Sequence, residues 1–239
     1  MPNEETSLIQ ARRPSVVKMQ EIEVPAGVNL FVQLMDWAWL WCLLLIDNIT
    51  YAFTAAFCVG VFTIFLHYTQ YKMGKTLHWP KPLDIIFAAV FGLLSIMTWV
   101  HQEDAETILL YLGPVLNSGL ALGFFVYWLI GRPVVTGYQL DKLGEAKASH
   151  PIIVHMAHQL SVMFTITFSF SAVIGTIWPG NDWSDLTCNV VNGVAMLTAY
   201  RFYPAYVKNN TDEFAALYED EIAEWEAKHP ELNFDAELA

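Results

Sequence analysis

The sequence is short of charge. Only 15% of its 239 residues are charged, and 12 of these are basic against 24 acidic, so the formal net charge is −12. Soluble domains carry about 25% charged residues, and the composition therefore disfavours an ordinary soluble globule. The shortage of basic residues argues against nucleic acid as a partner and against adhesion to anionic lipid.

Cysteine is also scarce, and recognisable catalytic motifs are missing. Cys42, Cys58 and Cys188 lie in apolar stretches, at spacings that match no metal-binding or redox motif. No HExxH, P-loop, GxSxG or dinucleotide-binding pattern occurs. The sequence therefore favours a non-catalytic role, and it predicts no cofactor.

Apolar residues, in contrast, are plentiful. They make up 55% of the chain, and the mean hydropathy is +0.37. A membrane-spanning helix needs about 17–25 mostly apolar residues. We therefore predict an all-α integral membrane bundle with six transmembrane helices, at residues 29–46, 50–69, 83–100, 107–130, 155–178 and 186–205. The first segment contains Gln33 and Asp36, so an interfacial helix is the alternative there.

The basic residues all fall on one side of these six spans. If the N-terminus is inside, the inside segments carry Arg12, Arg13, Lys18, Lys72, Lys75, Lys81, Arg132, Lys142, Lys147, Arg201, Lys208 and Lys228. The three short outside loops contain acidic residues and no basic residue. Because positive charge stays on the cytoplasmic side, we predict three helical hairpins, 29–69, 83–130 and 155–205, with both termini in the cytoplasm.

Three regions follow from this topology: a cytoplasmic N-terminal tail (1–28), the transmembrane domain (29–205) and an acidic C-terminal tail (206–239). The C-terminal tail has ten acidic and two basic residues. Its apolar residues recur at helical spacing and form one stripe of Phe214, Leu217, Tyr218, Ile222 and Trp225. Anionic headgroups would repel such an acidic helix. The stripe should therefore dock on protein, either on this chain's basic loops at 72–81 and 142–147 or on a partner subunit.

Several ionisable residues lie near the cytoplasmic ends of the predicted spans. Asp36, His67, His158 and Arg201 fall at similar depth, and an ionisable group inside a membrane is a functional-site hypothesis by default. One interpretation is a charge-satisfying pair of Asp36 with Arg201 or a histidine, which fixes helix order. Another is a proton-coupled transport site. A third is a haem or metal site through His67 with His155 or His158. His155 and His158 lie on one helical face, but two histidines do not make a metal site.

Two further features of the spans bear on packing. Trp37, Trp39 and Trp41 crowd the first span, where they either pack against lipid and protein or line a pigment. Gly119 and Gly123 stand four residues apart in the fourth span, the spacing that lets helix backbones approach closely.

One stretch resembles a known family. The sequence KPLDI at 81–85 opens a span, and the next span ends in LIGRP at 129–133. This arrangement resembles uncharacterised bacterial membrane proteins that are distantly similar to the intracellular septation protein A family, which often carry Gly-Arg-Pro-Phe-Thr…Tyr-Ala here. The matching residues are Gly131, Arg132, Pro133 and Tyr138, whereas Val134, Val135 and Gln139 depart from the motif. The resemblance covers about 100 of the 239 residues. It implies a multi-pass bacterial inner-membrane protein and supplies no catalytic residues.

Three functions are consistent with these features. The first is a non-catalytic structural or accessory subunit of a membrane protein assembly, with lipids and other subunits or further copies of the chain as partners. The second is a small proton-coupled transporter or channel that uses the Asp/His/Arg cluster. The third is a membrane redox subunit that carries haem, or an enzyme subunit that acts on lipid.

Overall fold

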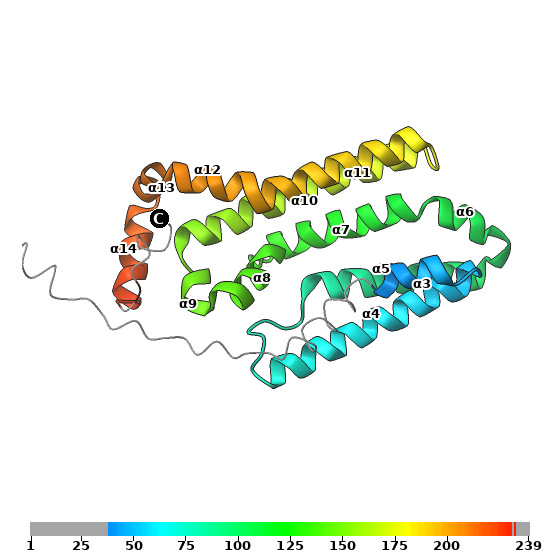
Figure 1. Ribbon diagram of the computed structural model, residues 1–239, viewed down its shortest axis with the longest axis horizontal. Coiled ribbons are helices and arrows are strands. Elements are labelled where there is room, and N and C mark those ends of the chain that lie inside the picture. Colours follow the sequence, from blue (N-terminus) through cyan, green and yellow to red (C-terminus); the bar gives the residue numbers. More distant parts are fainter. Residues whose placement is uncertain (1–37, 231, 233–239) are drawn as a thin grey trace, which may run out of the picture.

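The computed structural model describes residues 38–230 and 232. Within these residues every regular element is a helix (Figure 1). The N-terminal tail and the first half of the predicted span 29–46, with Gln33, Asp36 and Trp37, lie outside the described residues, as does the end of the C-terminal tail. The first described helix is α3 (Ala38–Leu45).

Four helices are long and apolar enough to cross a membrane, as expected for a multi-pass membrane protein: α4 (Ile49–Lys72), α5 (Pro82–Val100), α7 (Leu112–Leu129) and α10 (Pro151–Ile177). Their outward faces carry exposed large hydrophobic side chains, among them Phe65, Ile96, Leu122 and Ile166. Water would penalise such a surface, whereas lipid accommodates it. Three of these helices, α4, α5 and α10, match predicted spans to within a few residues at each end.

The predicted span 107–130 is broken at Tyr111 into α6 (Ala105–Leu110) and α7. Pro114 explains the break, because proline has no backbone N–H and its ring clashes with the carbonyl four residues earlier, that of Leu110. A short 3₁₀ turn, η1 (Gln102–Asp104), precedes α6.

The predicted span 186–205 is replaced by a longer, irregular rod. It consists of α11 (Asp182–Leu197), the π-helix η2 (Thr198–Phe202) and α12 (Tyr203–Asn209). Pro204 lies at the junction of η2 and α12, and a π-turn is one way for a helix to absorb a missing N–H. Because α11 alone has 16 residues and only α3 represents the first segment, four of the six predicted spans have a counterpart in a helix long and apolar enough to cross a membrane.

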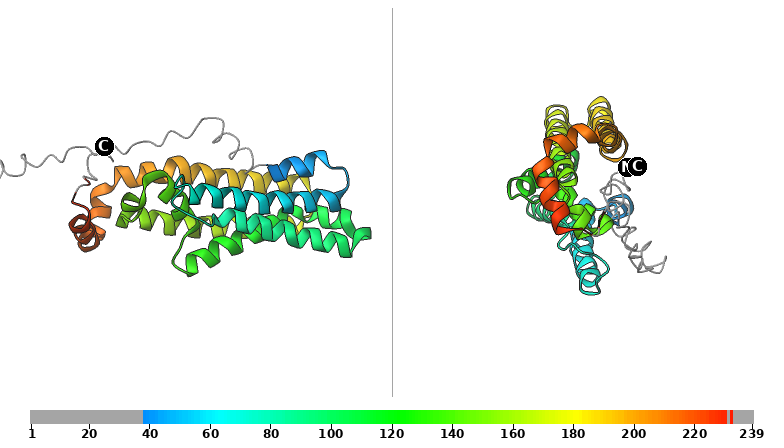
Figure 2. Two further views of the ribbon diagram at one scale, coloured as in Figure 1. Left: turned by 90° about the horizontal axis from the view of Figure 1, so that it is seen from below. Right: turned by 90° about the vertical axis from the view of Figure 1, so that its left-hand side faces the viewer.

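The long helices stand in an open row in sequence order. α4 packs on α5, α5 on α7, α7 on α10 and α10 on α11 (Figures 1 and 2). Small residues bring two of them close together, as their spacing predicts. A Cβ added to Gly119 would lie 2.3 Å from a methyl of Val90, and one added to Gly123 would lie 2.2 Å from Ile86 Cδ1.

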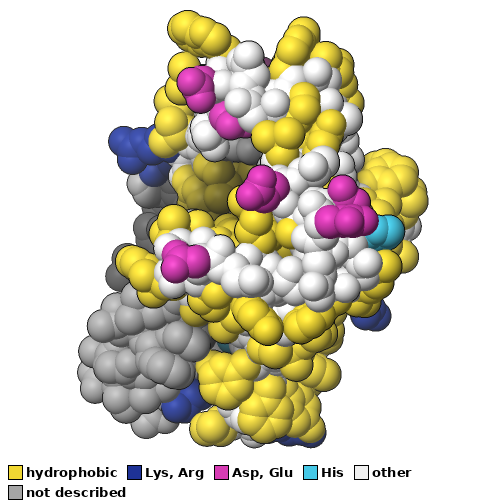
Figure 3. Space-filling view, turned by 90° about the vertical axis from the view of Figure 1, so that its right-hand side faces the viewer, with side chains coloured by type: hydrophobic (Ala, Val, Ile, Leu, Met, Phe, Trp, Pro, Cys, Tyr) yellow, Lys and Arg dark blue, Asp and Glu magenta, His cyan; other side chains and the backbone are white. Residues whose placement is uncertain are grey.

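The two ends of the row differ in charge. The end that we call the acidic end holds the loops with Asp47, Glu103, Asp104, Glu106, Asp182 and Asp185. Figure 3 shows carboxylates spread over this end, with a recess on one side where hydrophobic side chains line the surface. The opposite end, which we call the basic end after its connecting segments, carries Lys72, Lys75, Lys81, Arg132, Lys142 and Lys147, and the acidic segment 211–228 covers it.

The basic end is capped by short helices. α8 (Val134–Leu143) and α9 (Glu145–Ala148) connect α7 to α10 there. The C-terminal helices α13 (Thr211–Leu217) and α14 (Glu219–Lys228) follow α12, and α14 runs across this end of the row (Figure 1).

Candidate functional site

A histidine and an aspartate meet between α4 and α5 near the basic end. His67 Nδ1 lies 2.5 Å from Asp84 Oδ2, and the two side chains are 1% and 11% exposed. Paired ionisable groups at such depth in a membrane helix pair are expensive to bury. This pair is therefore the strongest candidate site among the described residues.

The hairpin geometry explains why these two side chains meet. α4 ends at Lys72 and α5 begins at Pro82, so His67 and Asp84 lie at the same level of two antiparallel helices. Pro82 occupies the first turn of α5, where its missing N–H costs nothing. Asp84 also lies in that first turn, where a carboxylate interacts favourably with the helix dipole.

The loop between the helices is tied down next to the pair. Trp79 Nε1 donates to the carbonyl of Ile64 at 3.3 Å, and its ring packs on Tyr68 with centroids 4.8 Å apart. From α8, Asp141 Oδ1 accepts hydrogen bonds from the backbone N–H groups of Leu77 at 2.7 Å and His78 at 3.2 Å. The loop is thus fixed to α4 on one side and to α8 on the other.

Opposite charges surround His78 in this loop. Lys81 Nζ lies 3.8 Å from Asp141 Oδ2. Burial lowers the pKa of His78; Asp141 opposes this shift, while Lys81 and Arg132 add to it. The ring fits against α8 only because residue 137 is glycine, since a Cβ there would lie 2.4 Å from His78 Cδ2.

Helices α4 and α5 make a different contact toward the acidic end. The hydroxyls of Thr54 and Ser95 lie 2.8 Å apart, and Trp99 Nε1 donates to Thr54 Oγ1 at 3.0 Å. An apolar layer of Phe53, Phe91 and Leu94, each 0% exposed, packs in the same interface. The interface therefore has polar contacts at both ends; Phe91 packs between them, and Phe53 and Leu94 adjoin the Thr54–Ser95 contact.

The cluster predicted from the sequence is only partly assembled. His67 is buried in α4, but its carboxylate partner is Asp84, and Asp36 lies outside the described residues. His158 is half-buried on α10, and Arg201 is exposed on η2. α5 and α7 stand between α4 and α10 (Figures 1 and 2). The structure thus does not bring His67 together with His158.

The predicted haem or metal residues are likewise separated. His155 Nδ1 lies 2.6 Å from the hydroxyl of Tyr218, while His67 is bonded to Asp84. Within residues 38–230, no group of three or more His, Cys, Asp and Glu side chains is placed to hold a metal ion.

The apolar stripe of the C-terminal tail packs on this chain. Trp225, 5% exposed, donates from Nε1 to Ala146 O at 3.1 Å and Ser149 Oγ at 3.0 Å. Phe214 and Ile222 pack against the buried cluster at the start of α10, and Tyr218 reaches His155. The stripe thus contacts the 142–147 segment at Ala146 and otherwise packs on Ser149 and the start of α10. Only Leu217, 65% exposed, faces away.

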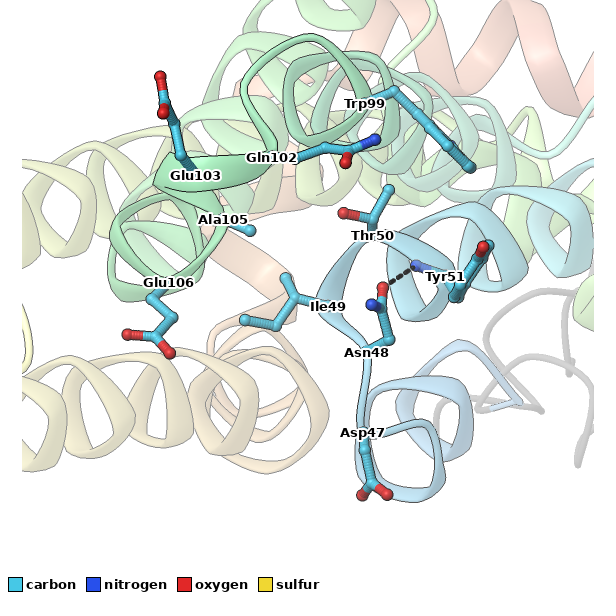
Figure 4. A pocket seen from close by; sticks show the side chains of 10 residues that line it. All are labelled: Asp47, Asn48, Ile49, Thr50, Tyr51, Trp99, Gln102, Glu103, Ala105 and Glu106. Atoms are coloured by element: carbon cyan, nitrogen blue, oxygen red, sulfur yellow. Dashed lines mark hydrogen bonds between the residues drawn. The ribbon is translucent and has the colours of Figure 1, made fainter.

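A pocket of about 390 Å³ opens at the acidic end (Figure 4). Thr50, Gln102 and Ala105 line its interior, whereas Asp47 and Glu106 turn their carboxylates away from it. The acidic residues therefore do not converge on a common point as cation ligands would.

Comparison with protein-family models, with curated proteins and with solved structures gives no match for this chain. The resemblance to the intracellular septation protein A family accordingly stays a prediction. Sequence reasoning identified His67 but missed Asp84, although one signal was present: the short connection between the second and third spans places both residues at the same depth.

Proposed function

We propose that the protein is a non-catalytic structural or accessory subunit of a membrane protein assembly, with six spans and both termini in the cytoplasm of a bacterium. The observation that carries this proposal is the outer face of α11, the helix at the edge of the row, whose large apolar side chains are left exposed by the described residues.

That face has the spacing of a helix-packing seam. Leu186, Val190, Gly193 and Leu197 follow one another at intervals of four, three and four residues, and the three large side chains are more than half exposed. A Cβ added to Gly193 would touch nothing. Apolar residues at heptad spacing form the contact line of paired helices, and a small residue on that line lets a second backbone approach. The seam thus suits one transmembrane helix of another subunit.

Two features support α11 and its continuation as a span. The rod from Asp182 to Asn209 has 28 helical residues, so its length is about 42 Å. Asn192 anchors it to its neighbours, since it accepts a hydrogen bond from Ser171 at 3.0 Å and donates one to Asn117 at 3.2 Å. The segregation of basic residues to one end of the row supports a cytoplasmic basic end.

Native isolation in mild detergent, followed by mass spectrometry, tests the proposal. We expect a foreign membrane subunit in stoichiometric amount, lost in Gly193→Leu because the new side chain fills the seam. Ile166→Phe, on the exposed face of α10, is the matched control and should keep the partner. A homogeneous species that contains only this chain would overturn the accessory role.

The buried His67–Asp84 pair favours a second candidate, a small proton-coupled transporter. Carboxylates paired with histidine line proton paths in membrane proteins. Solute uptake into vesicles, driven by a pH gradient, should then be abolished by Asp84→Asn and preserved in Asp104→Asn. Equal uptake by both variants would eliminate this candidate.

A further inference from the structure

We propose that His67 and Asp84 form a one-sided proton-binding site, which exchanges its proton with water at the basic end and is closed toward the acidic end. This inference goes beyond the assembly role, and it holds whether or not the chain transports a solute.

The charge of the His67–Asp84 pair determines what the pair binds. Asp84 Oδ2 and His67 Nδ1 are 2.5 Å apart and nearly buried. A deprotonated pair carries a net negative charge in a medium of low dielectric constant, which is costly. One added proton makes the pair neutral overall, with the hydrogen held between Nδ1 and Oδ2. The ligand is therefore a proton, and no bond between heavy atoms forms or breaks.

The pair reaches water at the basic end. His67 is 1% exposed and Asp84 is 11% exposed, so the carboxylate is the end that exchanges. Asp84 stands in the first turn of α5, three residues from Lys81, whose ammonium pairs with Asp141. The elements packed around the pair carry the following titratable or charged groups: Tyr68, Tyr71, Lys72, His78, Lys81, Arg132, Tyr138 and Asp141. All of these belong to the basic end.

Toward the acidic end, the packing of α4 on α5 forms a barrier. Between the pair and the Thr54–Ser95 contact, the backbones of α4 and α5 come so close that a Cβ on Gly60 would lie 3.3 Å from Ala88 Cα. Phe91, 0% exposed, packs in the same stretch, and a Cβ added to Gly92 would lie 3.1 Å from the ring of Phe57. The buried hydroxyl of Thr63 also lies there and donates to Val59 O of its own helix. A chain of water molecules needs room and a succession of polar partners, and this close packing with Thr63 as its one hydroxyl provides neither. A proton therefore enters and leaves by the same route.

Nitrogen-15 NMR of histidine-labelled full-length protein in lipid nanodiscs tests the binding step. The ring-nitrogen signals of His67 should change with pH as the pair gains its proton. In Asp84→Asn, which preserves side-chain shape but removes the ionisable carboxyl, we expect a different dependence on pH. Asp104→Asn, an exposed acid at the acidic end, should titrate like the wild type. His67 shifts that stay constant in the wild type, or titrate identically in Asp84→Asn, would overturn the proposal. The wild-type titration decides the matter even if a variant fails to fold.

Oriented vesicles test the sidedness. Orientation is read from protease access to a C-terminal tag, and proton uptake is followed by the infrared carboxyl band after a pH jump on one side only. A jump on the side of the basic end should change the band at once, whereas a jump on the other side should leave it unchanged until the vesicle leaks. The carboxyl band is assigned to Asp84 by its loss in Asp84→Asn. In the wild type it must respond first to the jump at the basic end; an equal response to jumps on both sides would refute closure toward the acidic end.

Discussion

The two ends of the α4–α5 interface make the same kind of contact with different chemistry. At the acidic end, Thr54 and Ser95 share a hydrogen bond of 2.8 Å between neutral hydroxyls. At the basic end, His67 and Asp84 share one of 2.5 Å between ionisable groups. Both contacts fix the register of the helices, but only the second joins ionisable side chains. A helix pair can thus use the same kind of contact at both ends while only one end contains groups that can carry charge.

The largest expected effect comes from removing the carboxylate at the basic end. Asp84→Leu leaves His67 buried without its acceptor, and loss of one partner from a buried pair costs about 3–5 kcal/mol. Denaturant unfolding in detergent should show this loss in the free energy of unfolding. Asp84→Asn, which still offers an oxygen to Nδ1, should lose clearly less. Equal losses would mean that shape, and not charge, stabilises this end.

The next largest effect is expected from the helices α13 and α14, which cover the basic end. Trp225→Ala removes a buried indole and two hydrogen bonds, a change that costs about 3 kcal/mol in a protein core. Hydrogen exchange should then accelerate in α13 and α14 and stay unchanged around Thr54 and Ser95. Leu217→Ala, at an exposed position of the same helices, should have no effect. Faster exchange at both ends would show that the ends are coupled.

A smaller effect is expected at the acidic end. A double-mutant cycle of Thr54→Val and Ser95→Ala should give a coupling of about 0.6 kcal/mol, typical of hydrogen bonds between membrane helices. The same detergent unfolding measurement applies. A coupling as large as that of the His67–Asp84 pair would erase the distinction between the two ends.

The smallest effect concerns His78, in the loop beside the charged pair. Burial lowers its pKa and Asp141 opposes the shift, so Asp141→Asn should lower the pKa further and Lys81→Gln should raise it. NMR titration of the His78 ring measures both changes. The unfolded chain binds a proton near the ordinary pKa of about 6.5, while the folded protein resists it. The His78 contribution to stability is therefore full above that value and falls as the pH drops below it. Opposite shifts would contradict the assigned causes.

Much of the fold could be predicted from apolar runs, because the length of a run sets the length of a membrane helix. α4, α5 and α10 follow the predicted spans closely, whereas Pro114 and Pro204 mark local irregularities that hydropathy averages away. Depth along the membrane could also be predicted, which is why His67 was identified. Which residues contact one another could not be predicted, since that depends on helix order: His158 and Arg201 were predicted at that depth but lie on other helices. Asp84 was missed because an acid in the first turn of a helix already has an explanation in the helix dipole.

The open row has a consequence for how the chain is made. Each long helix packs on the one synthesised just before it, so every helix leaving the ribosome meets a partner that is already in the membrane. Contacts between neighbours in sequence form with little loss of chain entropy. The His67–Asp84 bond can close as soon as the α4–α5 hairpin is inserted. Trp225 docks later, because its acceptors at Ala146 and Ser149 are in place long before its own helix, α14, is synthesised.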